Sequence, residues 1–173
     1  KVGYIEVIDP TTDLNIKADA TYTVKAKVWD QPPTTTPRHP VAPGVVVNWT
    51  HTPTGNGSGL SDSSSMTDSN GICTTIFTPS TTAGATFKVT ATHGTIFGDS
   101  KTFTVIHSDT MGSFKVEVVG ATPKTAGVSF DLKITAIDIY NNVMNTYDSP
   151  VTGDAITVTG ASNPSGSTDF TLP

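Results

Sequence analysis

Oxygen-bearing side chains gather where the last alternating stretch of the sequence ends. Asp138 closes that stretch, Asn141 and Asn142 follow it, and Asp109 lies near the start of the same half of the chain. Carboxylate and amide oxygens are the ligands that Ca²⁺ prefers in proteins. Their spacing is not that of an EF-hand, and loop Asp and Asn side chains more often accept hydrogen bonds from their own backbone turns. These four residues are therefore a candidate calcium site, with turn capping as the alternative.

A tryptophan beside a proline-rich segment forms the second candidate site. Trp29 ends an alternating stretch on the side that carries lysines, and the segment after it contains Arg38 and His39. Aromatic rings can stack on sugars, and exposed loops often carry binding residues. Packing of Trp29 beneath the loop is the first interpretation. A binding surface made of Trp29, Arg38 and His39 is the second.

The remaining reactive side chains form no recognisable catalytic or zinc-binding pattern, because zinc sites need clustered His or Cys ligands. The histidines are scattered along the chain: His39, His51, His93 and His107. Cys73 has no legible base and is predicted to face the core with Phe77. The serines around Asp62 lie in a polar loop without a G-x-S-x-G nucleophile elbow. We therefore predict that the chain is no enzyme and has no catalytic residue and no cofactor.

The composition predicts an exported protein rich in strands and turns. Only 35% of the 173 residues are hydrophobic and 14% are charged, and Thr, Ser and Gly make up the difference. A net charge of −5 without a basic stripe argues against nucleic acid as a partner. No stretch approaches the ~20 apolar residues of a membrane span. We expect an extracellular or cell-surface location and, since the sequence opens at Lys1 without a signal peptide, a piece of a longer protein.

Short alternating runs without helical periodicity predict a two-sheet antiparallel sandwich. In residues 21–29 apolar side chains occupy every second position, which places one face in a core and the other in water. Further strands are predicted at residues 3–8, 45–50, 71–78, 86–92, 102–106 and 114–119. The predicted core consists of apolar side chains that share one phase: Val24, Ala26, Val47, Trp49, Phe87 and Val89.

Two loops and one turn are legible between these strands. Proline cannot donate to a β-ladder, so residues 30–44 are predicted to form a long, stiff loop. Residues 52–65 are predicted to form a second, polar loop. Asn70-Gly71 is the strongest hairpin signal in the chain, and both residues are expected to have positive φ in a tight hairpin or its bulged relative.

The same strand pattern occurs twice in the sequence. Residues 18–30 align with residues 126–138 without a gap, and the inward positions stay apolar. The repeat distance of about 110 residues is the size of one immunoglobulin-like sandwich. We therefore predict an all-β fold of tandem immunoglobulin-like antiparallel β-sandwiches, with domains at 1–108 and 109–173. The second sandwich is predicted to be incomplete in this sequence.

The second copy has no counterpart of the strands at 71–78, 86–92 and 102–106. Its inward side chains at Phe130, Leu132 and Ile134 would then lack an opposing sheet. Further chain beyond residue 173 would complete this sandwich, and so would strands from a neighbouring copy. The sequence leaves the two alternatives open.

Residues 44–92 resemble the bacterial immunoglobulin-like domain 1 repeat of invasin and intimin. The resemblance is carried by "VVVNWT", the Leu60-Ser61 step, "TDSNG" (67–71) and "TAGATFKVTA" (82–91). Residues 125–143 resemble a related surface-protein repeat whose pattern usually reads AxDxxGN. Here Asn141 replaces the glycine, and asparagine accepts positive φ. The resemblance implies tandem rods on bacterial surfaces, with stalk or adhesive roles and no catalysis.

The function expected from the sequence is that of a structural or adhesive repeat in a secreted or surface-anchored prokaryotic protein, partnered by adjacent repeats of the same polypeptide. One alternative is an accessory module that binds a carbohydrate or a protein through the loops at 30–44 and 52–65. Another is a fibre or surface-layer subunit, in which copies of the chain assemble by exchanging strands at unpaired sheet edges.

Overall fold

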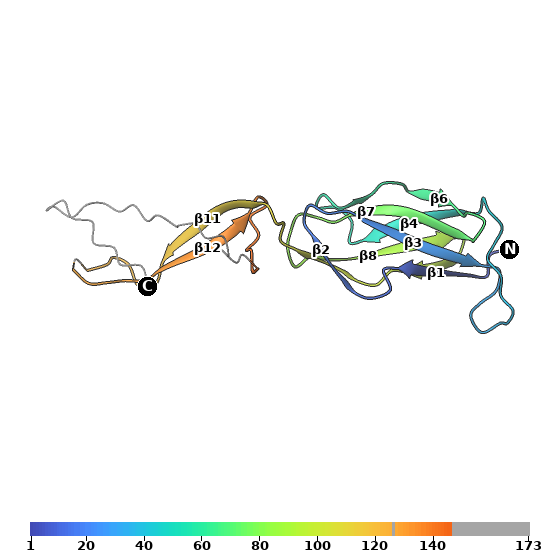
Figure 1. Cartoon of the computed structure of the whole chain (residues 1–173), viewed down its shortest axis with the longest axis horizontal. Coiled ribbons are helices and arrows are strands. Elements are labelled where there is room, and N and C mark those ends of the chain that lie inside the picture. Colours follow the sequence, from blue (N-terminus) through green and yellow to red (C-terminus); the bar gives the residue numbers. More distant parts are fainter. Residues whose placement is uncertain (126, 147–173) are drawn as a thin grey trace, which may run out of the picture.

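The computed structural model of the chain describes residues 1–125 and 127–146, and the regular elements in that part are all β-strands. Most strands form two sheets that pack face to face, while the last two form a separate sheet. Figure 1 shows the packed sheets and the separate sheet arranged end to end along the long axis of the molecule. The prediction of an all-β fold built from antiparallel sheets is confirmed.

The first sheet has the strand order β1-β3-β7-β5. Its members, in chain order, are β1 (Tyr4–Asp9), β3 (Tyr22–Trp29), β5 (Gly59–Leu60) and β7 (Ile72–Thr78). All of its pairings are antiparallel. The lysines and threonines of β3 face outward and its valines face inward, as the alternation predicts.

The second sheet has the order β2-β10-β8-β4-β6, and β9 pairs with β8 beside it. Its members are β2 (Leu14–Lys17), β4 (Val46–Thr52), β6 (Ser64–Met66), β8 (Thr86–His93), β9 (Ile96–Asp99) and β10 (Phe103–Ile106). β2 and β10 run parallel, which corrects the prediction of a purely antiparallel sandwich. The chain passes from β1 in one sheet to β2 in the other, and this crossing sets the direction in which β2 runs.

The predicted core lies between these sheets. Val24, Val47 and Val89 are fully buried, and Trp49 is 3% exposed. Phe77 stands at the centre, with its ring centroid 5.1 Å from that of Phe103 and 5.5 Å from that of Phe87. Such offset and tilted contacts are the geometry that aromatic rings favour. The six residues predicted for the core are all buried in one cluster.

Four short strands were absent from the sequence-based prediction: β2, β5, β6 and β9. β5 lies within residues 52–65, which were predicted as a loop without strands, and β6 begins at the end of that range. These strands are too short to show an alternation against their surroundings. Their pairing is fixed by the neighbouring strands rather than by their own residues.

The turn at Asn70-Gly71 is tight, as predicted, but it is not a hairpin turn. Gly71 has φ of 70°, and its N–H donates to the Asp68 carbonyl at 3.0 Å. Asn70, expected to have positive φ, is not among the non-glycine residues that do. The turn also does not join paired strands, because β6 pairs with β4 in the second sheet and β7 pairs with β3 in the first. It carries the chain from one sheet to the other.

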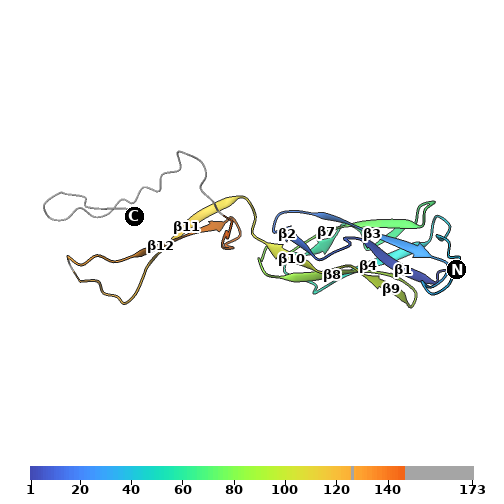
Figure 2. The same ribbon diagram turned by 60° about the horizontal axis from the view of Figure 1, so that its bottom comes forward.

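The separate sheet consists of β11 (Met111–Val118) and β12 (Leu132–Asp138), paired antiparallel. Figure 2 shows it beyond the end of the sandwich near β2 and β10. Phe130 is 48% exposed and Leu132 is 38% exposed, while Ile134 is half-buried. The part of the second predicted sandwich that follows residue 146 lies outside the described residues. What completes this sheet therefore stays a prediction.

Candidate functional site

Three of the four candidate calcium ligands, Asp138, Asn141 and Asn142, lie at the turn that ends β12, at the junction between the sandwich and the β11–β12 sheet. The Asn141 N–H donates to the Asp138 carbonyl at 3.1 Å, and Asn141 has φ of 67°. Asp138 Oδ1 accepts the N–H groups of Tyr140 at 2.9 Å and Asn142 at 2.8 Å. The asparagine thus supplies the left-handed conformation that glycine supplies elsewhere, as the sequence predicts.

The turn after β6 has the same pattern of hydrogen bonds. Asp68 Oδ1 accepts the N–H groups of Asn70 at 2.8 Å and Ile72 at 2.9 Å, and Gly71 takes the left-handed position. The Asp68 N–H also donates to the Ile72 carbonyl at 2.8 Å, as the Asp138 N–H does to Asn142 at 2.9 Å. The chain therefore uses one turn design twice. The first turn contacts β3, where the Val28 N–H donates to the Gly71 carbonyl at 2.9 Å, whereas the second contacts residues 81–83 and Ser108.

The second carboxylate oxygen of Asp138 contacts residues 107–110, which join β10 to β11 and are called the connecting segment. Oδ2 accepts the backbone N–H of Ser108 at 2.8 Å and the side-chain amide of Asn142 at 2.9 Å. Asp138 is 1% exposed and Ser108 is fully buried. Burial alone would raise the pKa of Asp138, but the hydrogen bonds from the Asn142 side chain and from backbone N–H groups outweigh it, so the pKa lies below its ordinary value. The charged carboxylate is therefore the form that suits this site.

Asn142 reaches across to the sandwich itself. Its side-chain Oδ1 accepts the Ala83 N–H at 2.8 Å, and its Nδ2 donates to the Thr81 carbonyl at 2.8 Å. Residues 81 and 83 belong to the loop between β7 and β8. One carboxamide thus satisfies a donor and an acceptor of a loop that is distant in sequence. We call Asp138 and Asn142 together the clasp.

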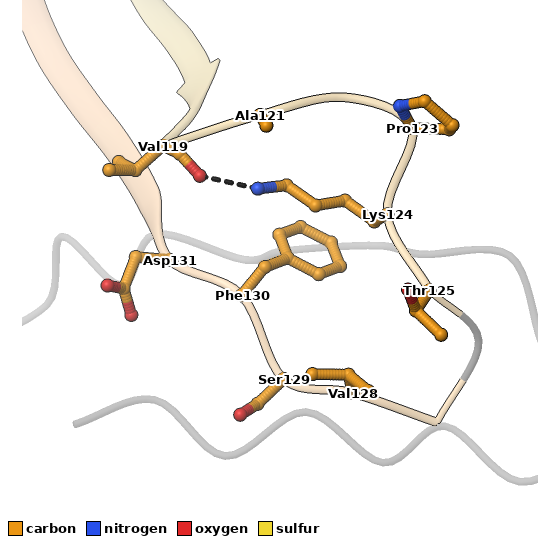
Figure 3. Close-up of a pocket in the computed structure, with 9 residues that line it drawn as sticks. All are labelled: Val119, Ala121, Pro123, Lys124, Thr125, Val128, Ser129, Phe130 and Asp131. Atoms are coloured by element: carbon orange, nitrogen blue, oxygen red, sulfur yellow. Dashed lines mark hydrogen bonds between the residues drawn. The ribbon is translucent and has the colours of Figure 1, made fainter.

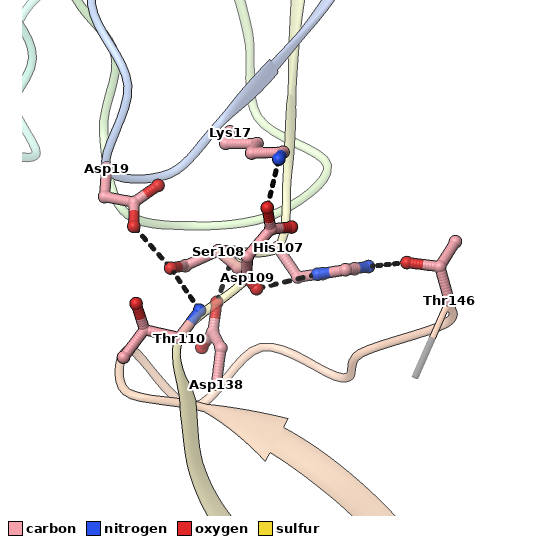
Figure 4. Close-up of polar contacts among 8 residues, drawn as sticks. All are labelled: Lys17, Asp19, His107, Ser108, Asp109, Thr110, Asp138 and Thr146. Atoms are coloured by element: carbon pink, nitrogen blue, oxygen red, sulfur yellow. Dashed lines mark hydrogen bonds and ion pairs between the residues drawn. The ribbon is translucent and has the colours of Figure 1, made fainter. Parts of the chain in front are cut away.

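The connecting segment has further contacts to both sides (Figure 4). The Ser108 hydroxyl donates to Asp19 and accepts the Thr110 N–H at 3.0 Å. Lys17 forms an ion pair with Asp109. Both of those side chains are exposed, so solvent screens the pair and it adds little stability. The buried contacts of Ser108 contribute more to the order of the segment.

His107 is a second buried link at the junction. Its Nδ1 lies 2.9 Å from the Ser108 carbonyl and its Nε2 lies 2.9 Å from the Thr146 hydroxyl. A carbonyl can only accept, so Nδ1 donates to it, and Nε2 forms the second hydrogen bond with the Thr146 hydroxyl. Figure 4 shows the ring between these two partners. The junction is therefore connected on two sides, by the clasp and by His107.

The structure brings three of the candidate calcium ligands together and places the fourth elsewhere. Asp138, Asn141 and Asn142 share one turn, whereas Asp109 faces Lys17. The Asp138 oxygens already accept four N–H groups. Within residues 1–125 and 127–146, no group of three or more His, Cys, Asp or Glu side chains is arranged to hold a metal. The geometry supports turn capping, and calcium binding stays an untested prediction.

Trp29, Arg38 and His39 meet at the opposite end of the sandwich. The Arg38 guanidinium carbon lies 4.2 Å from the Trp29 ring centroid, and Lys27 Nζ lies 4.3 Å from it. Trp29 Nε1 and Arg38 Nη1 are buried without a hydrogen-bond partner. The His39 N–H donates to Asp30 Oδ1 at 2.8 Å, which is the main reason that the pKa of Asp30 lies below its ordinary value. Both sequence-based interpretations of Trp29 thus have support, because its ring packs against Arg38 of the loop, while its own Nε1 and one Arg38 nitrogen remain without a partner.

The other reactive side chains have structural surroundings. Cys73 is buried, and desolvation raises the pKa of its thiol to about 11, so it is a poor nucleophile. Ser61 donates to Asp62 in an exposed pair. His51 packs against Phe77 and Phe87 and contacts the Ser58 hydroxyl at 3.1 Å. None of the three lies at the junction.

A shallow pocket lies at the far end of the β11–β12 sheet (Figure 3). Lys124 Nζ donates to the Val119 carbonyl at 2.6 Å and lies 5.8 Å from the Phe130 ring centroid. The loop that forms the pocket includes residue 126, which is outside the described residues. The lysine is already hydrogen-bonded, and the pocket combines one carboxylate, Asp131, with apolar side chains. We assign no role to it.

Sequence reasoning missed the residues that hold the connecting segment, namely Asp19, His107 and Ser108. Each was judged by its neighbours in sequence, whereas its partners lie far away along the chain. The adjacency of His107, Ser108 and Asp109 at the predicted junction was the available signal.

The two packed sheets define the chain as an all-β protein with an immunoglobulin-like sandwich. The chain is structurally similar to immunoglobulin-like domains of intimin. It matches the D0-D1 domain of intimin with 24% identity, a TM-score of 0.39 and coverage of 59% of this chain and 44% of that chain. It matches a C-terminal 282-residue fragment of intimin, in complex with the intimin-binding domain of the translocated intimin receptor, with 20% identity, a TM-score of 0.47 and coverage of 79% and 46%.

A third solved structure, the D00-D0 domain of intimin, matches with 18% identity, a TM-score of 0.43 and coverage of 61% and 46%. The chain thus spans less than half the length of each of these structures. No protein-family model matches the chain, and a search of curated proteins finds no match. Among the described residues there is no helix long and apolar enough to cross a membrane.

Proposed function

We propose that the chain consists of two successive immunoglobulin-like modules, residues 1–108 and 109–173, of a secreted or surface-anchored protein in which they serve as a stalk or adhesive repeat. The observation that carries the proposal is the clasp. Asp138 and Asn142 belong to the second module, and they bond to the connecting segment and to a loop of the first. In such a role the property that matters is the fixed orientation of one module relative to the next.

The clasp supports a fixed orientation because its contacts point in different directions. Ser108 N–H, Thr81 carbonyl and Ala83 N–H are three separate partners on the first module. A covalent connection alone would let two modules rotate, which is the default for neighbouring domains with small interfaces. Hydrogen bonds to separate points restrict that rotation, and His107 with Thr146 adds a further point. Two modules held in this way act as one rod.

The proposal is tested by the distribution of distances between the modules. Spin labels are attached to cysteines introduced by K88C in β8 and K133C in β12, both exposed positions. The buried Cys73 remains unlabelled. Double electron–electron resonance measures the distance between the two labels. It should give one narrow distance distribution for the chain that carries only these two cysteine substitutions. Replacing Asn142 by alanine removes both contacts to the loop and should broaden the distribution.

Asn145→Ala is the matched control, because this neighbouring asparagine is exposed. It should leave the distribution narrow. A broad distribution in the chain without N142A would mean that the modules rotate freely, and the proposed rod would then be wrong. An N142A chain as narrow as the control would mean that the clasp does not set the orientation.

A second function is favoured by the unsatisfied donors near Trp29. The buried Nε1 of Trp29 and Nη1 of Arg38 have no acceptor in the described part of the chain, and a ligand oxygen could supply one. This observation supports binding of a glycan or a protein through residues 30–44. Replacing residues 31–38 by the shorter Ile139–Asn141 turn of the second module should abolish such binding on a glycan array. Binding that survives this replacement would exclude the loop as the site.

A further inference from the structure

Four consecutive residue pairs of β11 and β12 repeat the pairing of β1 and β3. Ile5 faces Val28 in the first pair of strands, and Phe114 faces Ala136 in the second. Just before this, Gly3 and Gly112 lie against the backbone of the aspartate that ends the opposite strand. A Cβ atom would lie 2.4 Å from the Asp30 carbonyl oxygen at Gly3 and 2.5 Å from the Asp138 carbonyl oxygen at Gly112. The two strand pairs are therefore equivalent at this end, up to Val7 and Val116; beyond these residues β1 has a bulge that β11 lacks.

The closures after these strands are equivalent too, although the loops differ in length. The Asp30 N–H donates to the His39 carbonyl at 3.0 Å, as the Asp138 N–H does to Asn142 at 2.9 Å. Asp30 Oδ1 accepts the His39 N–H at 2.8 Å, and Asp138 Oδ1 accepts the Asn142 N–H at 2.8 Å. Isolated bridges follow in both, between Trp29 and Pro40 and between Ile137 and Val143. His39 is thus the structural counterpart of Asn142, and Asp30 that of Asp138.

The two equivalent ends differ in what contacts them. Asp138 is 1% exposed because its Oδ2 accepts Ser108 N–H at the junction. The Asp30 side chain is 36% exposed, and its Oδ2 lies 3.6 Å from His39 Nδ1. The His39 side chain is 67% exposed, whereas the amide of Asn142 bonds to the loop of the first module. We call Gly3, Asp30 and His39 the outer face.

We infer that the outer face binds the far end of another immunoglobulin-like module, the end that carries a β7–β8 loop and a connecting segment. The inference rests on the proposed modular function and names the partner of a second junction. At this second junction Asp30 Oδ2 would accept a backbone N–H from the connecting segment of the other module, as Asp138 Oδ2 accepts the Ser108 N–H. The chemistry expected of the partner is therefore an unpaired backbone N–H beside a loop that presents one carbonyl and one N–H.

His39 stands where the existing junction has Asn142. This difference should make the proposed second junction weaker than the existing one. A carboxamide presents its donor and acceptor on adjacent atoms, which suits the neighbouring Thr81 carbonyl and Ala83 N–H. An imidazole presents its two nitrogens on different sides of the ring. His39 can therefore satisfy only one of the two loop groups at a time, so Asp30 is the principal contact and H39N should tighten the junction.

The test places a matching end directly before the outer face. Residues 1–109 are joined to Lys1 of the whole chain, so that Gly3 stands after the added segment as Gly112 does after residue 109. The added segment contains every strand from β1 to β10 and the whole sandwich core, and it supplies its own Thr81, Ala83 and Ser108. Spin labels at K88C of the added copy and at K27C of the original first module report the new junction. Labels at K88C and K133C of the original modules report the existing one in a second sample.

The expected result is a single narrow distance distribution across the new junction. D30A should broaden this distribution to the width expected of a flexible tether, and H39N should narrow it further. D62A is the control, because Asp62 bonds only with its own neighbour Ser61 through its side chain, and it should change nothing. A broad distribution at the new junction that is insensitive to D30A overturns the inference. If the existing junction remains narrow in the same protein, the proposed function survives that result. If both are broad, the proposed function fails as well.

Discussion

Replacing Asp138 by alanine should release the connecting segment without unfolding the sandwich. The change removes the acceptor of four N–H groups. Tyr140 is exposed and Asn142 is half-buried, so water can solvate their N–H groups. Ser108 is fully buried, and its N–H is left without a partner. The effect should therefore be concentrated at Ser108.

The magnitude follows from the cost of an unsatisfied buried donor, about 1–3 kcal/mol. Local opening of the segment is easier by that amount, which corresponds to a loss of roughly ten- to a hundredfold in the protection of the Ser108 amide from hydrogen exchange. The amides of β3 and β8 should keep their protection, because their pairings lie within the sandwich. Amide exchange followed residue by residue by NMR measures both at once.

Asp68→Ala is the matched control for this experiment. It removes the equivalent acceptor, Asp68 Oδ1, of the Asn70 and Ile72 N–H groups. Asp68 makes no hydrogen bond to the connecting segment. It should lower the protection of Ile72 and leave Ser108 unchanged. Unchanged protection of Ser108 in the D138A chain would refute the reasoning, and the contacts of Asp19 and His107 would then account for the order of the segment.

The remaining predictions concern the sandwich. Trp49→Ala should lower the free energy of unfolding by about 3–5 kcal/mol in urea titrations, because it empties a buried site and leaves Ser65, now 2.7 Å from Trp49 Nε1, without its partner; a loss below about 1 kcal/mol would contradict the core assignment. Gly71→Val should cost at least about 1–2 kcal/mol, because φ is 70° and a Cβ would lie 2.8 Å from the Val28 carbonyl oxygen; a melting temperature equal to that of the unchanged protein would argue against strain at this turn. Burial lowers the pKa of His51, so the unfolded chain takes up the proton first as the pH falls below about 6.5, and stability should decline there until the folded state titrates as well. His51→Gln should flatten that decline in melts from pH 7 to about pH 5, and an unchanged slope would assign the pH dependence to other groups.

The sequence predicted the elements whose pattern is local and strong. The alternation of β3 placed Val24, Ala26 and Val28 inward, and all three are fully buried. Asn141 was recognised as a substitute for glycine and does take positive φ. Such predictions succeed because side-chain period and backbone preference are properties of neighbouring residues.

The predictions that failed concern contacts between residues far apart in the chain. β2 pairs in parallel with β10, and its four residues have no pattern that announces this partner. The turn at Gly71 was recognised, but its role in changing sheets depends on which strands β6 and β7 pair with. The contacts of Ser108 with Asp19 and Asp138 were likewise invisible, because serine beside aspartate is common in loops.

The parallel pairing of β2 with β10 has a consequence for a molecule under tension. β10 leads directly into the connecting segment, so a pull on the β11–β12 sheet reaches the sandwich through the end of this strand. The strand is flanked by β2 on one side and β8 on the other. The pull acts along the strand, across ladder hydrogen bonds that are perpendicular to it in the antiparallel pair with β8 and slanted in the parallel pair with β2. These bonds share the load instead of opening one after another. The sandwich is thereby built to resist extension along the line that joins it to its neighbour.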